Sequence, residues 1–152
     1  MSDLKEVIFK KGKAKNTNSK YANLEEKILI QANFIGANLI QANLKKVNLS
    51  EAHLEGSDLD WSDLAEANLT NCQLVGADLI GTNLTGANLK NANFAGANLL
   101  NANFTGANLR GASNLTIEQL SNVETLYKAE LDNVLLIPLK EKYPALFKEP
   151  KE

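Results

Sequence analysis

Apolar residues recur along this chain at every fifth position. From Phe34 to Leu109 there are 16 consecutive such positions, which we call the centres of the repeats; 13 are Leu and three are Phe. A helix repeats every 3.6 residues and a flat strand every two, so neither element explains a period of five. The pattern therefore predicts a chain that changes direction once in every repeat.

The positions before each centre are restricted in size and polarity. Two residues before the centre stands Ala in 11 repeats, and Asn stands immediately before it in 11 repeats. Residues two apart in an extended segment point the same way, so the centre and the small residue are predicted to face inward together. Gly at the last position of eight repeats indicates a tight turn, where a positive φ is often needed.

Short extended segments joined by regular turns wind into a coil. If four repeats close one coil, each coil has 20 residues and stacks on the next at strand spacing, about 4.8 Å. Backbone hydrogen bonds then run from coil to coil. In this register Leu74 lies between Leu54 and Phe94. The predicted core residues singled out are Phe34, Leu54, Leu74, Phe94, Ala77 and Cys72, the last as a buried, inert thiol.

The repeats ANLIQ, ADLIG, ANLTG, ANFAG and ANLLN resemble the motif A(D/N)LXX of the pentapeptide-repeat family. The resemblance covers at least residues 32–111. It implies an all-β repeat solenoid, a right-handed quadrilateral β-helix, whose number of sides and handedness the period alone does not fix. The C-terminal section looks like that of cyanobacterial members.

The repeat pattern divides the chain into three parts. Residues 1–20 hold a predicted opening strand, with Val7 and Phe9 in register, and then a basic segment. Residues 21–112 form the repeat solenoid, and residues 113–152 form a helical C-terminal cap and tail. The basic segment lacks interleaved aromatic residues, so we interpret it as a solvated loop and not as a contact for nucleic acid.

The end of the repeats predicts a cap of two short α-helices. Ser113 is one residue too many for the period, which places the break in register there. Thr116 and Gln119 have the spacing of a capping box, which predicts a helix over about 116–127. A second helix is predicted after Asp132. These helices are expected to cover the open end of the solenoid; the alternative is a detachable tail that binds a partner.

Composition narrows the functional classes. At 152 residues the chain is predicted to be one domain, and its net charge of -2 gives no general attraction to nucleic acid. The single cysteine leaves no internal disulfide framework and fits a reducing compartment. No apolar run is long enough for a membrane span, and the N-terminal residues lack the core of a signal peptide. We therefore expect a cytoplasmic protein.

Residues suited to catalysis or to metal binding are sparse. His53 stands in a slot that usually holds Asn, and no nucleophile or phosphate-loop pattern accompanies it. We predict that the protein is not an enzyme and uses no cofactor. Asp58 and Asp78 fall in one column about 5 Å apart. No carbonyl cage accompanies them to complete the shell that calcium needs, so no metal site is predicted.

Outward positions on one side form an apolar column that we predict to be a protein-binding face. Aligned aliphatic residues beside the single tryptophan are typical of an interface. The plain alternative is that these are isolated surface residues, which need no explanation. The predicted face comprises Ile40, Asp60, Ile80 and Leu100 in the column, Trp61 beside it, and Ile35 and Val75 on the preceding side.

We therefore predict a non-enzymatic interaction scaffold or regulatory protein that presents flat faces to an unidentified protein partner. A monomer or an N-terminal end-to-end dimer is expected, with no nucleic acid and no membrane as partner. One alternative, which the resemblance implies, is a DNA mimic that binds DNA gyrase; the other is a purely structural protein. Residues 21–112 carry nine acidic and five basic side chains, and the acids gather between Glu51 and Glu66. That clustering disfavours the DNA mimic, which requires acids along the whole rod.

Overall fold

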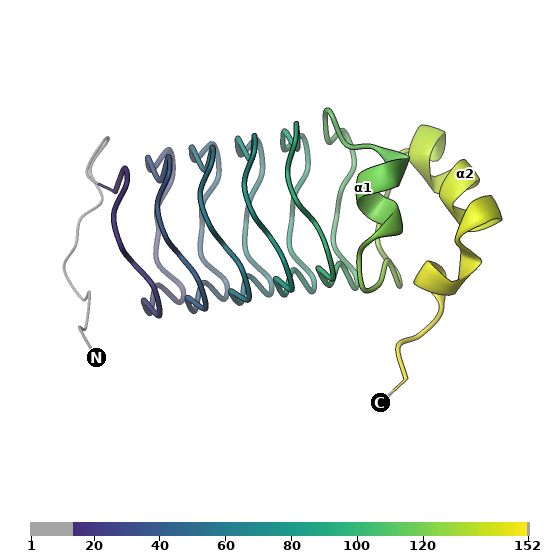
Figure 1. Ribbon diagram of the computed structural model, residues 1–152, viewed down its shortest axis with the longest axis horizontal. Helices are drawn as coiled ribbons and strands as arrows, with labels where there is room; N and C mark the ends of the chain where they lie inside the picture. Colours follow the sequence, from purple (N-terminus) through teal and green to yellow (C-terminus); the bar gives the residue numbers. More distant parts are fainter. Residues whose placement is uncertain (1–13, 152) are drawn as a thin grey trace.

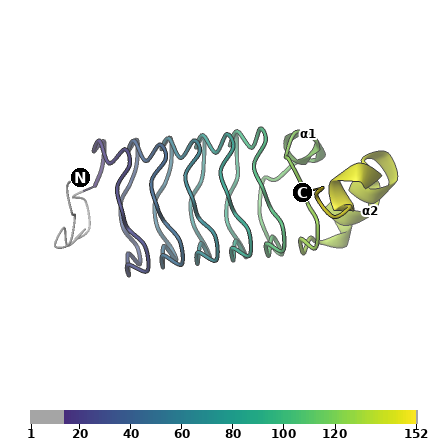
Figure 2. The ribbon, with the colours of Figure 1, turned by 90° about the horizontal axis from the view of Figure 1, so that it is seen from below.

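Stacked coils make up most of the computed structural model, which describes residues 14–151 (Figure 1). Parallel β-bridges join residues 20 positions apart, from Asn18↔Asn38 to Asn93↔Ser113. A turn falls in every repeat, so each coil contains four repeats and four corners. The pairing consists of isolated bridges because a corner interrupts each extended segment after three residues. Figure 2 shows the same stack from below, with the helices at its C-terminal end.

Each repeat satisfies its backbone groups in the same way. Leu54 N donates to Gln73 O one coil on at 2.8 Å, and Ser57 N closes the corner by donating to Leu54 O at 3.1 Å. The residue before the centre also supports the corner, as when Asn38 Oδ1 accepts from Ile40 N at 3.1 Å. This side-chain bond explains why Asn or Asp fills that position in most repeats.

The core is a file of stacked side chains along the axis of the solenoid. Leu54, Leu74 and Phe94 are fully buried, and the bridges on either side of Gln73 place them in three successive coils. Phe34 is buried one coil earlier. The small inward sites, Ala77 and Cys72 among them, are fully buried as well. Each fully buried Leu contributes roughly 1.5–3 kcal/mol relative to an exposed one.

The break in the repeat comes after Ser113, not at it. Ser113 still bridges Asn93, 20 residues earlier, whereas the next bridge, Asn103↔Thr125, spans 22 residues. Two extra residues are therefore inserted where the sequence suggested one. Helix α1 (Ile117–Ser121) occupies the stretch where they fall.

Helix α1 is shorter than the predicted helix over 116–127. Thr125 already bridges Asn103, and Leu126 is fully buried, so the chain has rejoined the coil there. The predicted length was wrong because apolar residues of the resumed coil happened to follow α1 at helical spacing. The predicted start is confirmed, since Thr116 and Gln119 form a capping box.

The second helix and a short 3-10 helix cover the last coil. Helix α2 (Asn133–Lys142) begins after Asp132, as predicted, and the 3-10 helix η1 (Pro144–Phe147) follows it. Leu146 O in η1 accepts from Leu126 N at 2.7 Å, which takes the place of a carbonyl from a further coil. The cap thus satisfies part of the edge that the end of the repeats would expose.

The first coil presents apolar side chains outward. Tyr21, Ile28 and Ile30 expose 64%, 77% and 50% of their surface. The N-terminal end-to-end dimer stays a prediction. The predicted opening strand, with Val7 and Phe9, lies outside the described residues.

Candidate protein-binding face

One side of the solenoid carries all seven residues of the predicted binding face. We call it the Trp61 face. The bridges Asn38↔Asp58 and Asp78↔Asn98, with Asp58↔Asp78 between them, hold its four coils in one column. The bridging residues run along the middle, and the corners on either side form two rims. In four successive coils the face comprises residues 35–41, 55–61, 75–81 and 95–101.

Both rims are mostly aliphatic, but in one coil each rim carries an acidic residue. Val75 and Leu100 expose 37% and 43% of their surface, whereas Ile35, Ile40 and Ile80 are half-buried. Both rims carry an acid in the same coil, so a band of carboxylates crosses the face between two apolar regions. The rim residues are Ile40, Asp60, Ile80 and Leu100 on one side, and Ile35, Glu55, Val75 and Ala95 on the other.

Trp61 stands at a corner of this acidic coil and is 59% exposed. Its φ is 57°, the left-handed conformation that eight Gly and 13 other non-Gly residues also adopt among residues 14–151. The indole lies against Gly81 one coil on, where an added Cβ would collide with the ring. Glycine is therefore favoured at position 81 for two reasons, the positive φ of the backbone and the close approach of the indole. The exposed indole of Trp61 contributes nothing evident to the core.

The carboxylate of Asp60 links two coils. Its Oδ1 accepts from Ile80 N at 2.9 Å, although in most repeats that N–H bonds the Asn or Asp two residues before it. Asp60 N follows the usual pattern and donates to Asp58 Oδ1 at 3.1 Å. Burial raises the pKa of Asp60; the hydrogen bond from Ile80 opposes this, and the charges of Asp58 and Asp78 add to it. Like charges and half-buried aliphatic side chains therefore surround this carboxylate.

Glu55 extends the acidic band to the other rim. Its Oε1 lies 3.0 Å from His53 Nδ1, an ion pair that exists only when the histidine is protonated. Its Oε2 is buried and has no hydrogen-bond partner among residues 14–151. Sequence reasoning missed Glu55 because its column was judged by Ile35 and Val75 alone.

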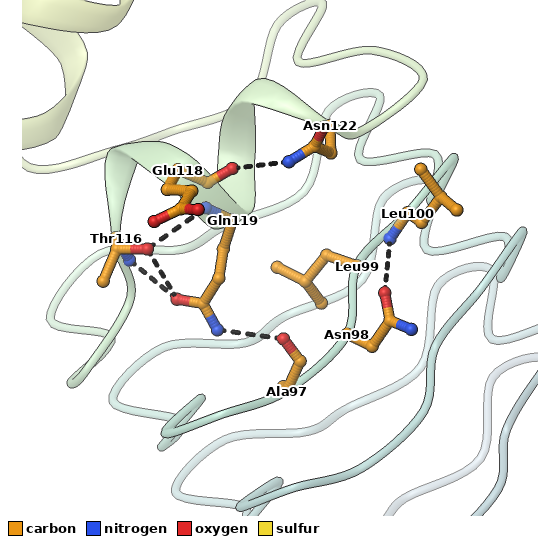
Figure 3. Close-up of a pocket in the computed structure, with 8 residues that line it drawn as sticks. All are labelled: Ala97, Asn98, Leu99, Leu100, Thr116, Glu118, Gln119 and Asn122. Carbon is orange, nitrogen blue, oxygen red and sulfur yellow. Dashed lines mark hydrogen bonds between the residues drawn. The ribbon is translucent and has the colours of Figure 1, made fainter.

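A pocket of about 330 Å³ lies at the C-terminal end of the face, between α1 and the last coil of the column. In Figure 3 Gln119 reaches from α1 toward Ala97, and Leu99 lies beside it. Leu100, from the rim, also lines the pocket, as does Glu118. This pocket was not predicted from the sequence, because the helix was expected to lie over the open coil at the end of the rod.

The single cysteine has a structural role, and the acidic and histidine side chains form no metal site among the described residues. Cys72 Sγ donates to Leu49 O at 2.8 Å, and burial raises the pKa of the thiol to about 12. A nucleophilic thiol needs an exposed, basic setting instead. Within residues 14–151 there is no group of three His, Cys, Asp or Glu side chains that could hold a metal ion.

Stacked coils of four repeats, flat sides and a capped end define a solenoid repeat protein. The sequence assigns it further. The chain belongs to the family described as Pentapeptide repeats, whose family model matches eight copies. The matched segments are residues 20–50, 32–71, 42–79 and 72–111.

Several solved structures resemble the chain. A pentapeptide repeat protein from the thylakoid lumen of Arabidopsis thaliana is 32% identical, with 64% of this chain and 71% of that chain covered at a TM-score of 0.53. One from the cyanobacterium Cyanothece 51142 is 29% identical, with 78% and 86% covered at a TM-score of 0.46. QnrB1, a plasmid-mediated fluoroquinolone resistance protein, is 21% identical, with 84% and 85% covered at a TM-score of 0.50.

The comparison with curated proteins finds no match. Among the helices of residues 14–151, none has the length and apolar character needed to cross a membrane.

Proposed function

We propose that this chain is a non-enzymatic interaction scaffold, built as a right-handed quadrilateral β-helix, whose Trp61 face binds a protein partner. Pentapeptide repeat proteins are generally structural or interaction proteins, which agrees with this role. Within the described chain Cys72 is buried and His53 contacts Glu55 of its own repeat. We therefore assign the function to an exposed face of the rod. A cytoplasmic, regulatory role remains our prediction.

The observation that carries the proposal is the exposed indole of Trp61 packed on Gly81. Tryptophan is the residue type most enriched among those that dominate binding energy, especially beside apolar neighbours that exclude water. Ile80 occupies the adjoining rim position in the next coil. An exposed Trp that the core does not require, beside aliphatic residues, supports an interface.

Gyrase binding by DNA mimicry is less well supported. A DNA mimic needs acidic charge along the whole rod. The side opposite the Trp61 face, residues 45–51, 65–71, 85–91 and 105–111, carries four basic and two acidic residues. The likeness to QnrB1 is one of fold alone.

The proposal is tested by affinity capture from an extract of cells that express the protein. The bait variant is Trp61→Asn with Ile80→Ser, since Asn and Ser occupy equivalent positions in other repeats at Asn71 and Ser50. Trp61 is exposed and Ile80 is half-buried at a rim outside the core, so we expect the thermal midpoint to stay close to that of the wild type. We expect the recovered partner to fall by about tenfold or more, because anchor residues commonly contribute over 1–2 kcal/mol each.

The matched control is Ile30→Ser, which removes a half-exposed isoleucine from a different corner column. It is expected to recover the partner as the wild type does. Equal recovery by the Trp61→Asn/Ile80→Ser bait would show that the Trp61 face is not the binding surface.

A further inference from the structure

The charge of the Trp61 face is one-sided. Its 28 residues include Glu55, Asp58, Asp60 and Asp78 and no Lys or Arg. The opposite side, counted over the same number of residues, has a net charge of +2, and the whole chain has -2. The acids of the Trp61 face therefore do not reflect a generally acidic surface. They are concentrated in two neighbouring coils.

Neighbouring lysines leave these acids unneutralised. Lys45, at the corner between the next side and the opposite side, pairs instead with Asp63 at 3.3 Å. Asp58 Oδ1 and Asp60 Oδ1 are each engaged by a backbone N–H, so each carboxylate is fixed in place. Among residues 14–151 no side chain donates to their second oxygens, Oδ2. Fixed carboxylates with an oxygen directed to no internal donor are arranged for a donor from outside.

Apolar residues lie in the coils on both sides of the acidic band. Ile35 and Ile40 precede it, and Val75 and Ile80 follow it, at a coil spacing of about 4.8 Å. Trp61 stands at the end of the band with its indole exposed. Glu118 adds another carboxylate beside the pocket next to Leu100. The face thus alternates apolar, acidic and apolar surface along the rod.

We propose that the Trp61 face binds an extended segment of its partner that carries arginines alternating with aliphatic side chains, an inference that rests on the function proposed above. The arginines contact Asp58, Asp60 and Asp78, and the aliphatic side chains contact the rims. In an extended segment, residues two apart point the same way at about 6.6 Å, so a segment inclined to the rod axis by about 43° advances one coil spacing of about 4.8 Å for every two residues.

Arginine suits this surface better than lysine does. Its planar guanidinium can bond two acceptors at once, and Asp58 and Asp78 offer carboxylates from neighbouring coils. It also stacks on aromatic faces, and the indole of Trp61 is available at the end of the band. Nucleic acid is repelled by the same four carboxylates. An aliphatic segment without basic residues would leave them uncompensated beneath the partner.

The experiment measures binding of fluorescent synthetic peptides to the full-length chain by anisotropy. The first peptide repeats Arg-Ser-Leu-Ser, the second replaces each Leu with Ser, and the third replaces each Arg with Glu. The protein variant is Asp58→Asn with Asp78→Asn, which copies Asn38 and Asn98 in the same column. Asn at position 58 can keep the corner hydrogen bond from Asp60 N, and Asp78 has no such bond to lose because Ile80 N donates to Asp60. The control, Asp63→Asn with Glu66→Gln, makes the same change of net charge away from the face.

The first peptide is expected to bind the wild type more tightly than the other two, and its binding to weaken with salt. The Asp58→Asn/Asp78→Asn variant is expected to bind it about tenfold more weakly, while the control stays within about twofold of the wild type. An equal loss of affinity in the control variant would show that only the net charge of the protein matters, which would overturn the inference. Unchanged affinity in the Asp58→Asn/Asp78→Asn variant would show that these two acids do not contact the peptide. Absence of binding to the wild type would overturn the inference.

The two proposals fail separately. If partner capture requires Trp61 and Ile80 but is unaffected by Asp58→Asn/Asp78→Asn, the face is a docking surface, and the inference that the partner's segment carries arginines is wrong. If the wild type sediments as a dimer that these acidic-face substitutions dissociate, the occupant is a second copy of the chain, which also overturns the inference. If capture does not require Trp61 and Ile80, the proposed function itself fails.

Discussion

Replacing Phe94 with alanine is expected to lower the free energy of unfolding by about 3–5 kcal/mol. Phe94 is fully buried in the inner file, with Leu74 one coil before it and the start of the cap after it. Its N–H donates to Ser113 O at 3.0 Å, so the backbone on both sides is fixed and cannot collapse into the space left by the ring. A cavity in a stacked file also weakens the contacts of both neighbouring coils.

The measurement is urea denaturation of the wild type, Phe94→Ala and the surface control Leu100→Ala. Leu100 lies six residues from Phe94 and is 43% exposed, so its replacement should cost less than about 1 kcal/mol. A loss for Phe94→Ala no larger than that of the control would contradict a core made of stacked centres.

Replacing Gln119 with alanine is expected to lower the free energy of unfolding by about 2–4 kcal/mol, the sum of a lost cap and one unsatisfied carbonyl, that of Ala97, since Phe94 O also accepts from Ala97 N. Its Nε2 donates to Phe94 O at 2.8 Å and to Ala97 O at 3.0 Å. In the preceding coil the equivalent carbonyl, Ala77 O, accepts from the backbone of Asn98 at 2.9 Å. The side-chain amide of Gln119 thus replaces a backbone donor that is lost where α1 interrupts the ladder.

Two further variants separate the roles of Gln119. Gln119→Glu keeps an oxygen that can accept from Thr116 N, as Gln119 Oε1 does at 2.8 Å, but removes the donor to the coil. We expect it to be at least as destabilised as Gln119→Ala, because a carboxylate would face two carbonyl oxygens. Ser121→Ala, in the same helix, should change the thermal midpoint little. If Gln119→Glu is as stable as the wild type, the loss of stability in Gln119→Ala comes from the capping box alone, and the hydrogen bonds of Gln119 to the coil contribute nothing.

The core was predictable because one physical rule acts on every repeat. Each centre and each small residue meets the same inward environment, so the period of five appears without exception from Phe34 to Leu109. The stacking of Leu54, Leu74 and Phe94 follows from that period once the coil length is set at 20. The corner role of Asn and Asp was not predictable in the same way, since it depends on a local bond from Asn Oδ1 to the N–H two residues on.

The cap was predicted in part. Thr116 and Gln119 carry a local signal, the capping box, that depends only on nearby residues. The length of α1 depends instead on Thr125 pairing with Asn103, a contact between distant residues that competes with helix formation. For the same reason the bonds of Gln119 to Phe94 and Ala97 could not be derived from spacing.

The candidate face was predicted by counting residues in steps of 20. Such counting shows which residues share a column but not which side chains are in contact. That arithmetic placed Asp60 between Ile40 and Ile80. It did not reveal that Asp60 accepts from Ile80 N, or that the indole of Trp61 lies on Gly81. Both contacts depend on the side-chain rotamers at a corner, which the repeat does not determine.

Trp61 offers the most direct test of the central claim, that a protein partner covers its face. It is the only tryptophan in the chain, so its fluorescence reports on this face alone. The captured partner is titrated into the wild type while emission wavelength and acrylamide quenching are recorded. The account predicts a shift to shorter wavelength and protection from the quencher that saturate together with binding. A partner that binds by sedimentation while both properties of Trp61 stay unchanged would contradict it.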